Sequence, residues 1–327
     1  LPAFAKDYFR AIEPTTSTKT RISYAYDIRI FFQFLISQNP SLAKIGIPNL
    51  NVSVLDQLKP IDIEEYMEYL KLYDSPNDQT TITNGERGLK RKISSLRSFY
   101  TYYYKRQAIE TNPVQLVDMP KIHDKAIIRL DAGETAALLD YIEHCGDQRK
   151  AYYEKTILRD LAIVTLLLGT GIRVSECVGL DVEDIDFRNN GIRLIRKGGS
   201  EMVVYFGPEV EKALKDYLEA RKAISPLEGH EHALFYSTQR KRIGVQAVEN
   251  LVKKYARAIT TTKKITPHKL RSTYGTTLYQ ETGDIYLVAD VLGHKDVNTT
   301  KKHYAAMDDA RRRSAASAVQ LREEHPY

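Results

Sequence analysis

Four short segments in the second half of the sequence carry cationic side chains that could act together on one anion. In chain order they are Gly-Ile-Arg-Val-Ser-Glu at 171–176, Arg-Lys-Gly-Gly at 196–199, Thr-Pro-His-Lys-Leu-Arg at 266–271 and Leu-Gly-His at 292–294. Tyr304 follows His294 by ten residues. Arginine, lysine and protonated histidine donate hydrogen bonds to anions, so the set indicates a cationic site with a phenol near it in the chain.

The third segment predicts a helix that presents two of these side chains. Thr266 can cap the start of a helix, and Pro267 suits the first turn. His268 and Arg271 are then three residues apart and project from one face, where both could reach the same anion.

The first segment has the same spacing. Gly171 is expected to break the helix that ends near Leu168, and Arg173 and Glu176 lie three residues apart on the helix that follows. A carboxylate at this position can hold a guanidinium group in place.

The remaining candidates are expected at turns or just after them. Lys197 lies beside the glycine turn of a predicted hairpin, where it could carry an ammonium group into a site. His294 follows Gly293 in a turn. Asn298 is placed to cap a helix that presents Tyr304 about two turns later.

Taken singly, each of these residues has a simpler structural explanation. An arginine near a helix start commonly forms a surface salt bridge, and a lysine at a hairpin tip is commonly solvated. Tyr304 is one of 22 tyrosines, most of which serve packing. The functional interpretation therefore depends on the ordered set.

The ordered set resembles the tyrosine recombinase and phage integrase family. The family pattern runs arginine, lysine, histidine-x-x-arginine, histidine or tryptophan, and tyrosine, and this sequence matches it at every position. Gly-Ile-Arg-Val-Ser-Glu and Leu-Gly-His are most similar to the Xer branch and to related mobile-element integrases. The resemblance covers nearly the whole chain and implies a site-specific recombinase that cleaves and rejoins DNA.

The resemblance also implies a role for each residue. The scissile phosphate would be surrounded by Arg173, Lys197, His268, Arg271 and His294. Tyr304 would be the nucleophile that forms a 3′-phosphotyrosyl bond, and Glu176 would support the first arginine. Lys197 would act as general acid and His268 would assist proton transfer. No cofactor or metal is implied, and the sequence carries no glycine-rich phosphate loop.

The first half of the sequence is predicted to be helical. Apolar residues recur at helical spacing over 16–37, from Pro60 to about Leu70, and over 82–106. In the third of these helices, residues at steps of four and three predict a buried stripe made of Leu89, Ile93, Leu96, Tyr100 and Tyr103.

Away from this stripe, the third helix carries basic residues and no carboxylate from Arg87 to Arg106. We expect this face to bind DNA phosphates through Arg87, Lys90, Arg91, Lys92, Ser94 and Arg97. The alternative is an ordinary solvated helix surface without a ligand.

A polar, proline-marked segment divides the chain into two predicted domains. We expect a helical core-binding domain of the SAM-like type over 1–118, a linker over 119–128 and a catalytic domain over 129–327. The catalytic domain has a predicted helix from Asp131, capped by Glu134, further helices near 153–169, 208–223 and 245–260, and a hairpin around the Gly198-Gly199 turn. The fold class is thus mainly α with a small β-sheet, a helical core-binding domain joined to a mixed α/β tyrosine-recombinase catalytic domain.

Composition is consistent with this interpretation. A chain of 327 residues commonly forms two domains, and its net charge of +6 favours polyanionic partners. Cys145 and Cys177 are too few for a disulfide framework or a cysteine zinc site. The sequence contains no apolar run long enough for a membrane span, which makes the cytoplasm, with its nucleoid DNA, the simplest location.

The resemblance predicts the partners as well. It implies double-stranded DNA with an inverted-repeat core site and a homotetramer on that DNA, alone or with a partner recombinase or accessory protein. The amphipathic segment 315–321 is expected to be a helix, either packed on its own domain or exchanged between subunits. The role would be resolution of chromosome dimers or integration and excision of a mobile element. A type IB topoisomerase that only relaxes DNA and a non-cutting DNA-binding regulator are the alternatives.

Overall fold

The computed structural model describes residues 1–74, 80–123, 127–144, 154–196, 199–294, 296–297 and 300, with the backbone alone at 154–155. The chain divides into two compact units, the first formed by Leu1–Lys125 and the second beginning at Ala126. The division lies within residues 119–128. Each unit has its own hydrophobic core.

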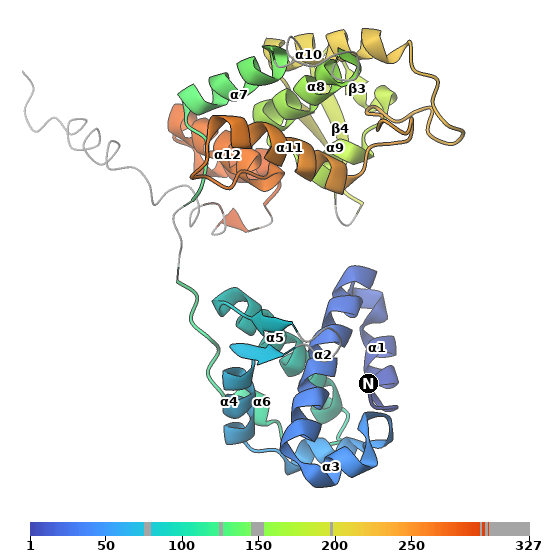
Figure 1. Cartoon of the computed structure of the whole chain (residues 1–327), viewed down its shortest axis with the longest axis vertical. Helices are drawn as coiled ribbons and strands as arrows, with labels where there is room; N and C mark the ends of the chain where they lie inside the picture. Colours follow the sequence, from blue (N-terminus) through green and yellow to red (C-terminus); the bar gives the residue numbers. More distant parts are fainter. Residues whose placement is uncertain are drawn as a thin grey trace, which may run out of the picture. The chain divides into compact units, whose positions relative to one another are not determined.

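The first unit is a cluster of helices with one small hairpin (Figure 1). Its α-helices are α1 (Ala5–Ile12), α2 (Thr18–Gln38), α3 (Pro40–Ile45), α4 (Pro60–Tyr69), α5 (Glu86–Lys105) and α6 (Pro113–Leu116). Short 3-10 helices occupy Glu13–Thr15, Ile47–Asn49 and Val52–Gln57. Strands β1 (Leu72–Asp74) and β2 (Thr81–Thr83) pair antiparallel, with Tyr73 opposite Ile82.

The core of the first unit forms where aromatic side chains of α1 and α2 meet α5. The predicted stripe on α5 is confirmed, because each of its members is at most 8% exposed: Leu89, Ile93, Leu96, Tyr100 and Tyr103. Tyr8 and Phe32 pack edge-on against Phe99, with ring centroids 5.1 and 6.1 Å apart. Large aromatic rings bury much apolar area each, so they contribute strongly to the continuous core of this small unit.

The observed helix limits confirm two predictions and correct a third. The helices predicted over 16–37 and from Pro60 are α2 and α4. The third helix begins at Glu86 and not at 82, because residues 81–83 form strand β2. The hairpin was not predicted, since strands of three residues are too short to show an alternating pattern.

A buried ion pair links α2 to α5. Asp27 is only 2% exposed, and its carboxylate accepts two hydrogen bonds from Arg91. Lys92 donates to the Asn84 side chain at 3.0 Å and lies 4.0 Å from Asp27. Lys92 was expected on the exposed side of the helix, but it is 7% exposed; burial lowers its pKa, and the Asp27 carboxylate opposes that shift.

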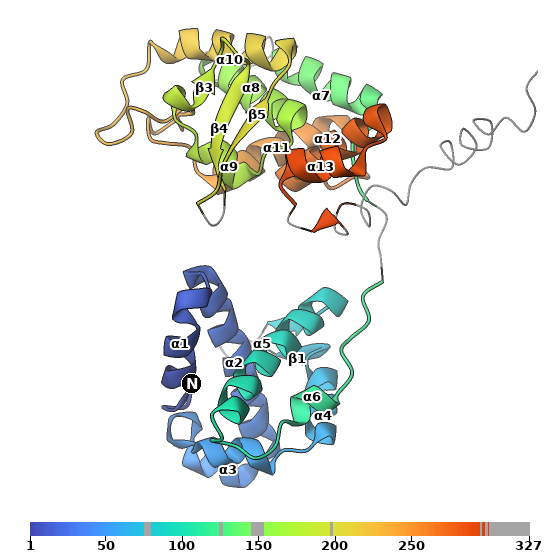
Figure 2. The ribbon, with the colours of Figure 1, turned by 180° about the vertical axis from the view of Figure 1, so that it is seen from behind.

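The second unit combines seven α-helices among its described residues with a three-stranded sheet (Figures 1 and 2). Its helices are α7 (Ala132–His144), α8 (Glu154–Thr170), α9 (Val174–Gly179), α10 (Pro208–Arg221), α11 (Val245–Ile259), α12 (Pro267–Thr282) and α13 (Ile285–Leu292). A 3-10 turn covers Val182–Asp184. The helices predicted near 153–169, 208–223 and 245–260 are therefore confirmed.

Two further predictions for this unit are confirmed. Asp131 and Glu134 cap the start of α7 reciprocally, each side chain accepting the backbone N–H of the other at 2.8 Å. The predicted hairpin is formed by β4 (Gly191–Ile195) and β5 (Glu201–Tyr205), with Ile192 opposite Val204. A short strand that was not predicted, β3 (Ile185–Asp186), pairs with the other side of β4.

The core of the second unit lies between the helices and the inward face of the sheet. Ile192 and Leu194 are buried, whereas Arg193 and Ile195 are exposed, as expected for a strand with one solvated face. Burial raises the pKa of the Cys177 thiol to about 12, so it stays protonated; Cys145 is outside the described residues. Along the described ranges, no helix is long and apolar enough to cross a bilayer.

We predict that Asp27→Ala lowers the free energy of unfolding of the first unit by about 3 kcal/mol or more, because removing one partner leaves the buried Lys92 cation uncompensated. Chemical denaturation followed by circular dichroism measures this loss. The control is Asp7→Ala, whose carboxylate lies 3.9 Å from Arg10 on the surface and should contribute less than about 1 kcal/mol. Equal losses in the two variants would contradict the assignment.

Candidate active site

The described part of the predicted site is organised around the carboxyl end of helix α13. Three successive carbonyl groups there each accept a hydrogen bond from a different arginine. The pairs are Val291 with Arg196 at 2.9 Å, Leu292 with Arg271, and Gly293 with Arg173 at 3.3 Å. Carbonyls at a helix end lack intrahelical donors and carry the negative end of the helix dipole, so guanidinium groups stabilise them.

Arg173 occupies the residue before α9 and is fixed by Glu176. Its backbone N–H donates to Glu176 Oε2 at 2.7 Å, and its Nη1 donates to Glu176 Oε1 at 2.8 Å. The structure thus contains the ion pair that the spacing predicted, although Arg173 caps the helix and does not lie within it. The Glu176 side chain is 7% exposed and that of Arg173 is 41% exposed, so the guanidinium remains accessible.

Helix α12 carries the second arginine. Arg271 is 5% exposed and donates to the carbonyls of Gly171 and Leu292. It therefore joins the end of α8, the end of α13 and its own helix. His268, one turn earlier, is exposed. Thr266 precedes the helix as predicted, but its side chain makes no capping hydrogen bond.

Gly171 allows these elements to approach each other. Its φ angle is +61°, a conformation that favours glycine. A Cβ atom at this residue would lie 2.3 Å from Cδ1 of Tyr274. The sequence-based expectation of a helix break at Gly171 is confirmed, since α8 ends at Thr170.

The third arginine, Arg196, was not among the predicted site residues. Its side chain is 10% exposed and packs across Gly293, where an added Cβ would lie 1.3 Å from Arg196 Nη1. Its Nε lies 3.9 Å from Glu176 Oε1. Burial lowers the pKa of this guanidinium and the Glu176 carboxylate raises it. Period-two alternation was the available signal, because residues 192 and 194 lie on the inward face of β4 and residue 196, directly after the strand, continues that period.

His294 follows this turn directly. Its backbone N–H donates to Ala289 O at 2.9 Å, which closes the end of α13. Its Nδ1 lies 2.7 Å from the Thr300 hydroxyl, so that contact orients the imidazole ring. The half-buried residue His294 is therefore fixed at both its backbone and its imidazole ring.

Among the described residues, the structure therefore links Arg173, Glu176, Arg271 and His294 through one turn, and it places His268 on the same helix as Arg271. Lys197, Asn298 and Tyr304 lie outside the described residues. The site can gather several cations around one anionic group.

Comparison with known proteins gives the family. The model of the phage integrase family matches residues 129–311, more than half of the chain. Tyrosine recombinase XerC of Caldanaerobacter subterraneus subsp. tengcongensis is 33% identical, with 97% of this chain and 86% of the relative covered. Tyrosine recombinase XerS of Streptococcus equi subsp. zooepidemicus is 30% identical, with 94% and 93% covered.

The chain belongs to the phage integrase family. It is a tyrosine site-specific recombinase of the Xer and integrase type, an enzyme that cleaves and rejoins DNA. The matched range contains all six residues of the predicted catalytic set.

Solved structures show the same fold. The Tn1549 transposon integrase in complex with transposon right end DNA has a TM-score of 0.68 at 20% identity, covering 95% of this chain and 98% of that one. XerH bound to its difH substrate has a TM-score of 0.60 at 20% identity, covering 80% and 71%. The predicted fold class, a helical core-binding domain joined to a mixed catalytic domain, is confirmed.

The predicted DNA-binding residues of α5 fall into two groups in the recombinase. Arg87, Lys90 and Ser94 are exposed, and the Ser94 hydroxyl donates to Lys90 O at 2.8 Å. The others bond within the unit: Arg91, which is also exposed, and the buried Lys92 lie beside Asp27, and Arg97 donates to the carbonyls of Val114 and Val117 at 3.1 and 2.6 Å. Contact of these six residues with DNA stays a prediction.

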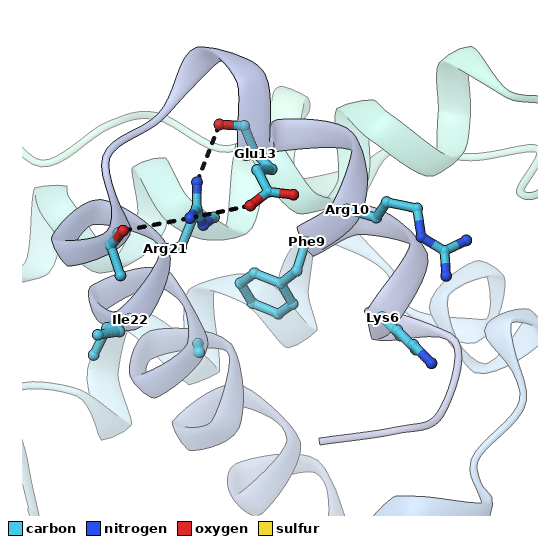
Figure 3. A pocket seen from close by; sticks show the side chains of 8 residues that line it. Lys6, Phe9, Arg10, Glu13, Arg21 and Ile22 are labelled. Carbon is cyan, nitrogen blue, oxygen red and sulfur yellow. Dashed lines mark hydrogen bonds and ion pairs between the residues drawn. The ribbon is translucent and has the colours of Figure 1, made fainter.

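A hollow on the first unit is separate from these residues. It lies between α1 and α2 and is lined by Lys6, Phe9, Arg10, Glu13, Thr18, Arg21, Ile22 and Ala25. Figure 3 shows Arg21 directed at Glu13, to whose carbonyl it donates at 3.0 Å, with Lys6 and Arg10 on the other side of Phe9. None of the catalytic candidates lines it, so it is not part of the candidate site.

We predict that Glu176→Gln lowers the rate of DNA cleavage about 10-fold or more, because a neutral amide no longer fixes the Arg173 guanidinium. Single-turnover cleavage with saturating enzyme measures the effect. Asp184→Asn is the matched control: Asp184 accepts the Asp181 N–H at 3.0 Å and pairs with Arg193 at 3.1 Å, but it lies outside the site. Equal rates for the two variants would argue against this role of Glu176.

Proposed function

We propose that the recombinase cleaves DNA by attack of the Tyr304 hydroxyl on a backbone phosphorus atom. The new bond is a 3′-phosphotyrosyl ester, and the 5′-oxygen of the next nucleotide leaves. The observation that supports this proposal is the convergence of Arg173 and Arg271 on one turn, directly before His294. Such a cluster of cationic donors suits a phosphate whose negative charge must be neutralised during attack.

The donors would act mainly on the transition state. A phosphodiester repels nucleophiles through its charge, and a phenol with an ordinary pKa of about 10 is mostly protonated at neutral pH. Arg173, His268, Arg271 and His294 would bind the non-bridging oxygens, and a preorganised donor of this kind contributes about 3 to 4 kcal/mol. The Glu176 pair supports this function because it holds Arg173 in place before DNA binds.

Two proton transfers complete the step. His268 would help to remove the proton from the Tyr304 hydroxyl, and Lys197 would give a proton to the departing 5′-oxygen. Because the phosphotyrosyl ester keeps the phosphate activated, the 5′-hydroxyl of a partner strand can reverse the reaction and rejoin the DNA. No cofactor is required by this scheme.

We further propose the assembly and the setting. The substrate is double-stranded DNA with an inverted-repeat core site, bound by a homotetramer, with or without a partner recombinase or accessory protein. The segment 315–321 would dock as a helix on a neighbouring subunit. The setting is intracellular DNA, where the enzyme would resolve chromosome dimers or move a mobile element; the relatives include both Xer recombinases and a transposon integrase.

We expect the wild-type protein to form a covalent protein–DNA adduct with a suicide substrate that carries a nick near the cleavage point. The adduct forms because the short fragment diffuses away and religation fails. Tyr304→Phe should form none, since it lacks the nucleophilic oxygen. Denaturing gel electrophoresis measures the adduct.

A two-site plasmid assay distinguishes the alternatives. Deletion or inversion products identify a recombinase, and relaxation alone would indicate the activity of a type IB topoisomerase. Absence of an adduct in the wild type would leave a DNA-binding regulator and overturn the proposed mechanism.

We propose that the first unit grips the DNA backbone through the exposed residues of α5. Arg87→Ala combined with Lys90→Ala should weaken DNA binding and make the slope of log Kd against log salt shallower by about 2, because two phosphate contacts are lost. Fluorescence anisotropy across a salt series measures the slope. Arg91 and Arg97 are unsuitable for this test, since their replacement would also disturb the fold.

The control for this test is Lys19→Ala combined with Lys44→Ala, which removes the same charge from exposed residues outside α5. A slope equal to that of the control would show that the α5 face is an ordinary solvated surface.

A further inference from the structure

Arg196 is a buried cation that the catalytic scheme above does not use. It follows the last residue of β4, where its backbone N–H donates to Ser200 O at 2.9 Å and its carbonyl accepts from the Gly199 N–H at 2.9 Å. These bonds connect the two ends of the loop that joins β4 to β5. The side chain therefore leaves the end of the sheet from a fixed point, and it is only 10% exposed.

From that point the Arg196 guanidinium reaches both neighbouring elements of the site. Nη2 donates to Val291 O at 2.9 Å, and Nε lies 3.9 Å from Glu176 Oε1. The same Glu176 oxygen accepts from Arg173 at 2.8 Å. One carboxylate thus lies between two guanidinium groups, and both groups are also bonded to the carboxyl end of α13, Arg196 at Val291 O and Arg173 at Gly293 O.

The fit between Arg196 and the turn leaves no spare room. Gly293 has φ +60°, and its missing side chain provides the surface on which the guanidinium lies. Arg196 Nε is buried and has no hydrogen-bond acceptor among the residues that the structure describes. A buried donor without an acceptor costs about 1 to 3 kcal/mol, a cost that is tolerated where a group serves the site.

We infer that Arg196 is a positioning residue for the recombinase reaction. It holds the Gly293–His294 turn against the Arg173–Glu176 pair, so that His294 and Arg173 address the same phosphate. This inference rests on the proposed function, because it concerns the charge that develops on that phosphate. Arg196 is not itself required to touch DNA.

The test compares two substrates that differ only in charge at the scissile position. One is an ordinary suicide substrate, and the other carries a methylphosphonate there, in which a methyl group replaces one non-bridging oxygen and removes the negative charge. On the ordinary phosphate, Arg196→Gln should cleave about 10- to 100-fold more slowly than wild type, because displacement of positioned groups by about 1 Å costs on that order. On the methylphosphonate, the cleavage rates of the two proteins should differ by less than about threefold, since less negative charge develops on the substrate and needs to be neutralised.

Arg193→Gln is the matched control. Arg193 lies on β4, three residues before Arg196, but its side chain is 57% exposed and pairs with Asp184 at 3.1 Å on the surface. It should cleave both substrates at the wild-type rate. DNA affinity and the midpoint of thermal unfolding are measured for both variants, and we expect Arg196→Gln to bind DNA as wild type does.

A second variant covers the case in which Arg196→Gln does not fold. Gly293→Ala keeps Arg196 but places a Cβ atom where its guanidinium lies. It should show the same dependence on the substrate, slow on the phosphate and close to wild type on the methylphosphonate.

Equal losses of cleavage rate by Arg196→Gln on both substrates would overturn the inference, because they would indicate that Arg196 has a general structural role. Wild-type cleavage by Arg196→Gln would overturn it as well. A third substrate has sulfur in place of the 5′-bridging oxygen, and its leaving group needs no general acid. If only this substrate restored the cleavage rate of Arg196→Gln, the effect of Arg196 would lie at the leaving group, which would contradict the inference. Failure of the proposed function is distinguishable, since the wild type would then form no adduct on the ordinary phosphate.

Discussion

The arrangement of the site depends on one interaction, the binding of three guanidinium groups by the last carbonyls of α13. Arg173 precedes α9, Arg196 follows β4, and Arg271 lies in the second turn of α12. Each would repel the others, and in a low-dielectric interior that repulsion is large. The helix dipole and the carbonyl oxygens provide fixed partial negative charge, so the cations can stay together when no substrate is present.

Glu176 neutralises part of the remaining positive charge. It is buried, and its two oxygens bind the backbone and the side chain of Arg173 while one of them also faces Arg196. Glu176 lies beside Arg173 and Arg196, and the Asp290 carboxylate also stabilises the charge of Arg196. Two carboxylates against three guanidinium groups leave the described part of the site with net positive charge. This excess suits an anion that arrives with the DNA and leaves with it, because a fully neutral site would have little electrostatic reason to bind a phosphate.

Residue types and spacing predicted most of this architecture. The α5 stripe, the Asp131 cap, the β4–β5 hairpin and the Arg173–Glu176 pair each follow from local rules, since every partner lies within a few residues of the other or on a regular helical period. The predictions fell short where the decisive partner is distant in the chain. Lys92 was placed on the exposed face because nothing near it reveals Asp27, which comes 65 residues earlier.

Arg196 was not predicted for the same reason. Its neighbour Lys197 matches the family pattern, whereas the contacts of Arg196 with Glu176 and Val291 are long-range. Short strands such as β1 and β3 were missed because two or three residues cannot show periodicity. An arginine that continues the inward alternation of a strand is nevertheless a detectable signal, because a buried charge there requires partners from elsewhere in the fold.

The two hydrogen bonds that Arg97 makes to Val114 and Val117 have a mechanical consequence. They bind the middle of α5 to the segment by which the chain leaves the first unit. The helix proposed to hold DNA is therefore braced directly against the root of the tether. In the proposed complex, a force that the duplex exerts on α5 would reach Val117 through these bonds as well as along the chain.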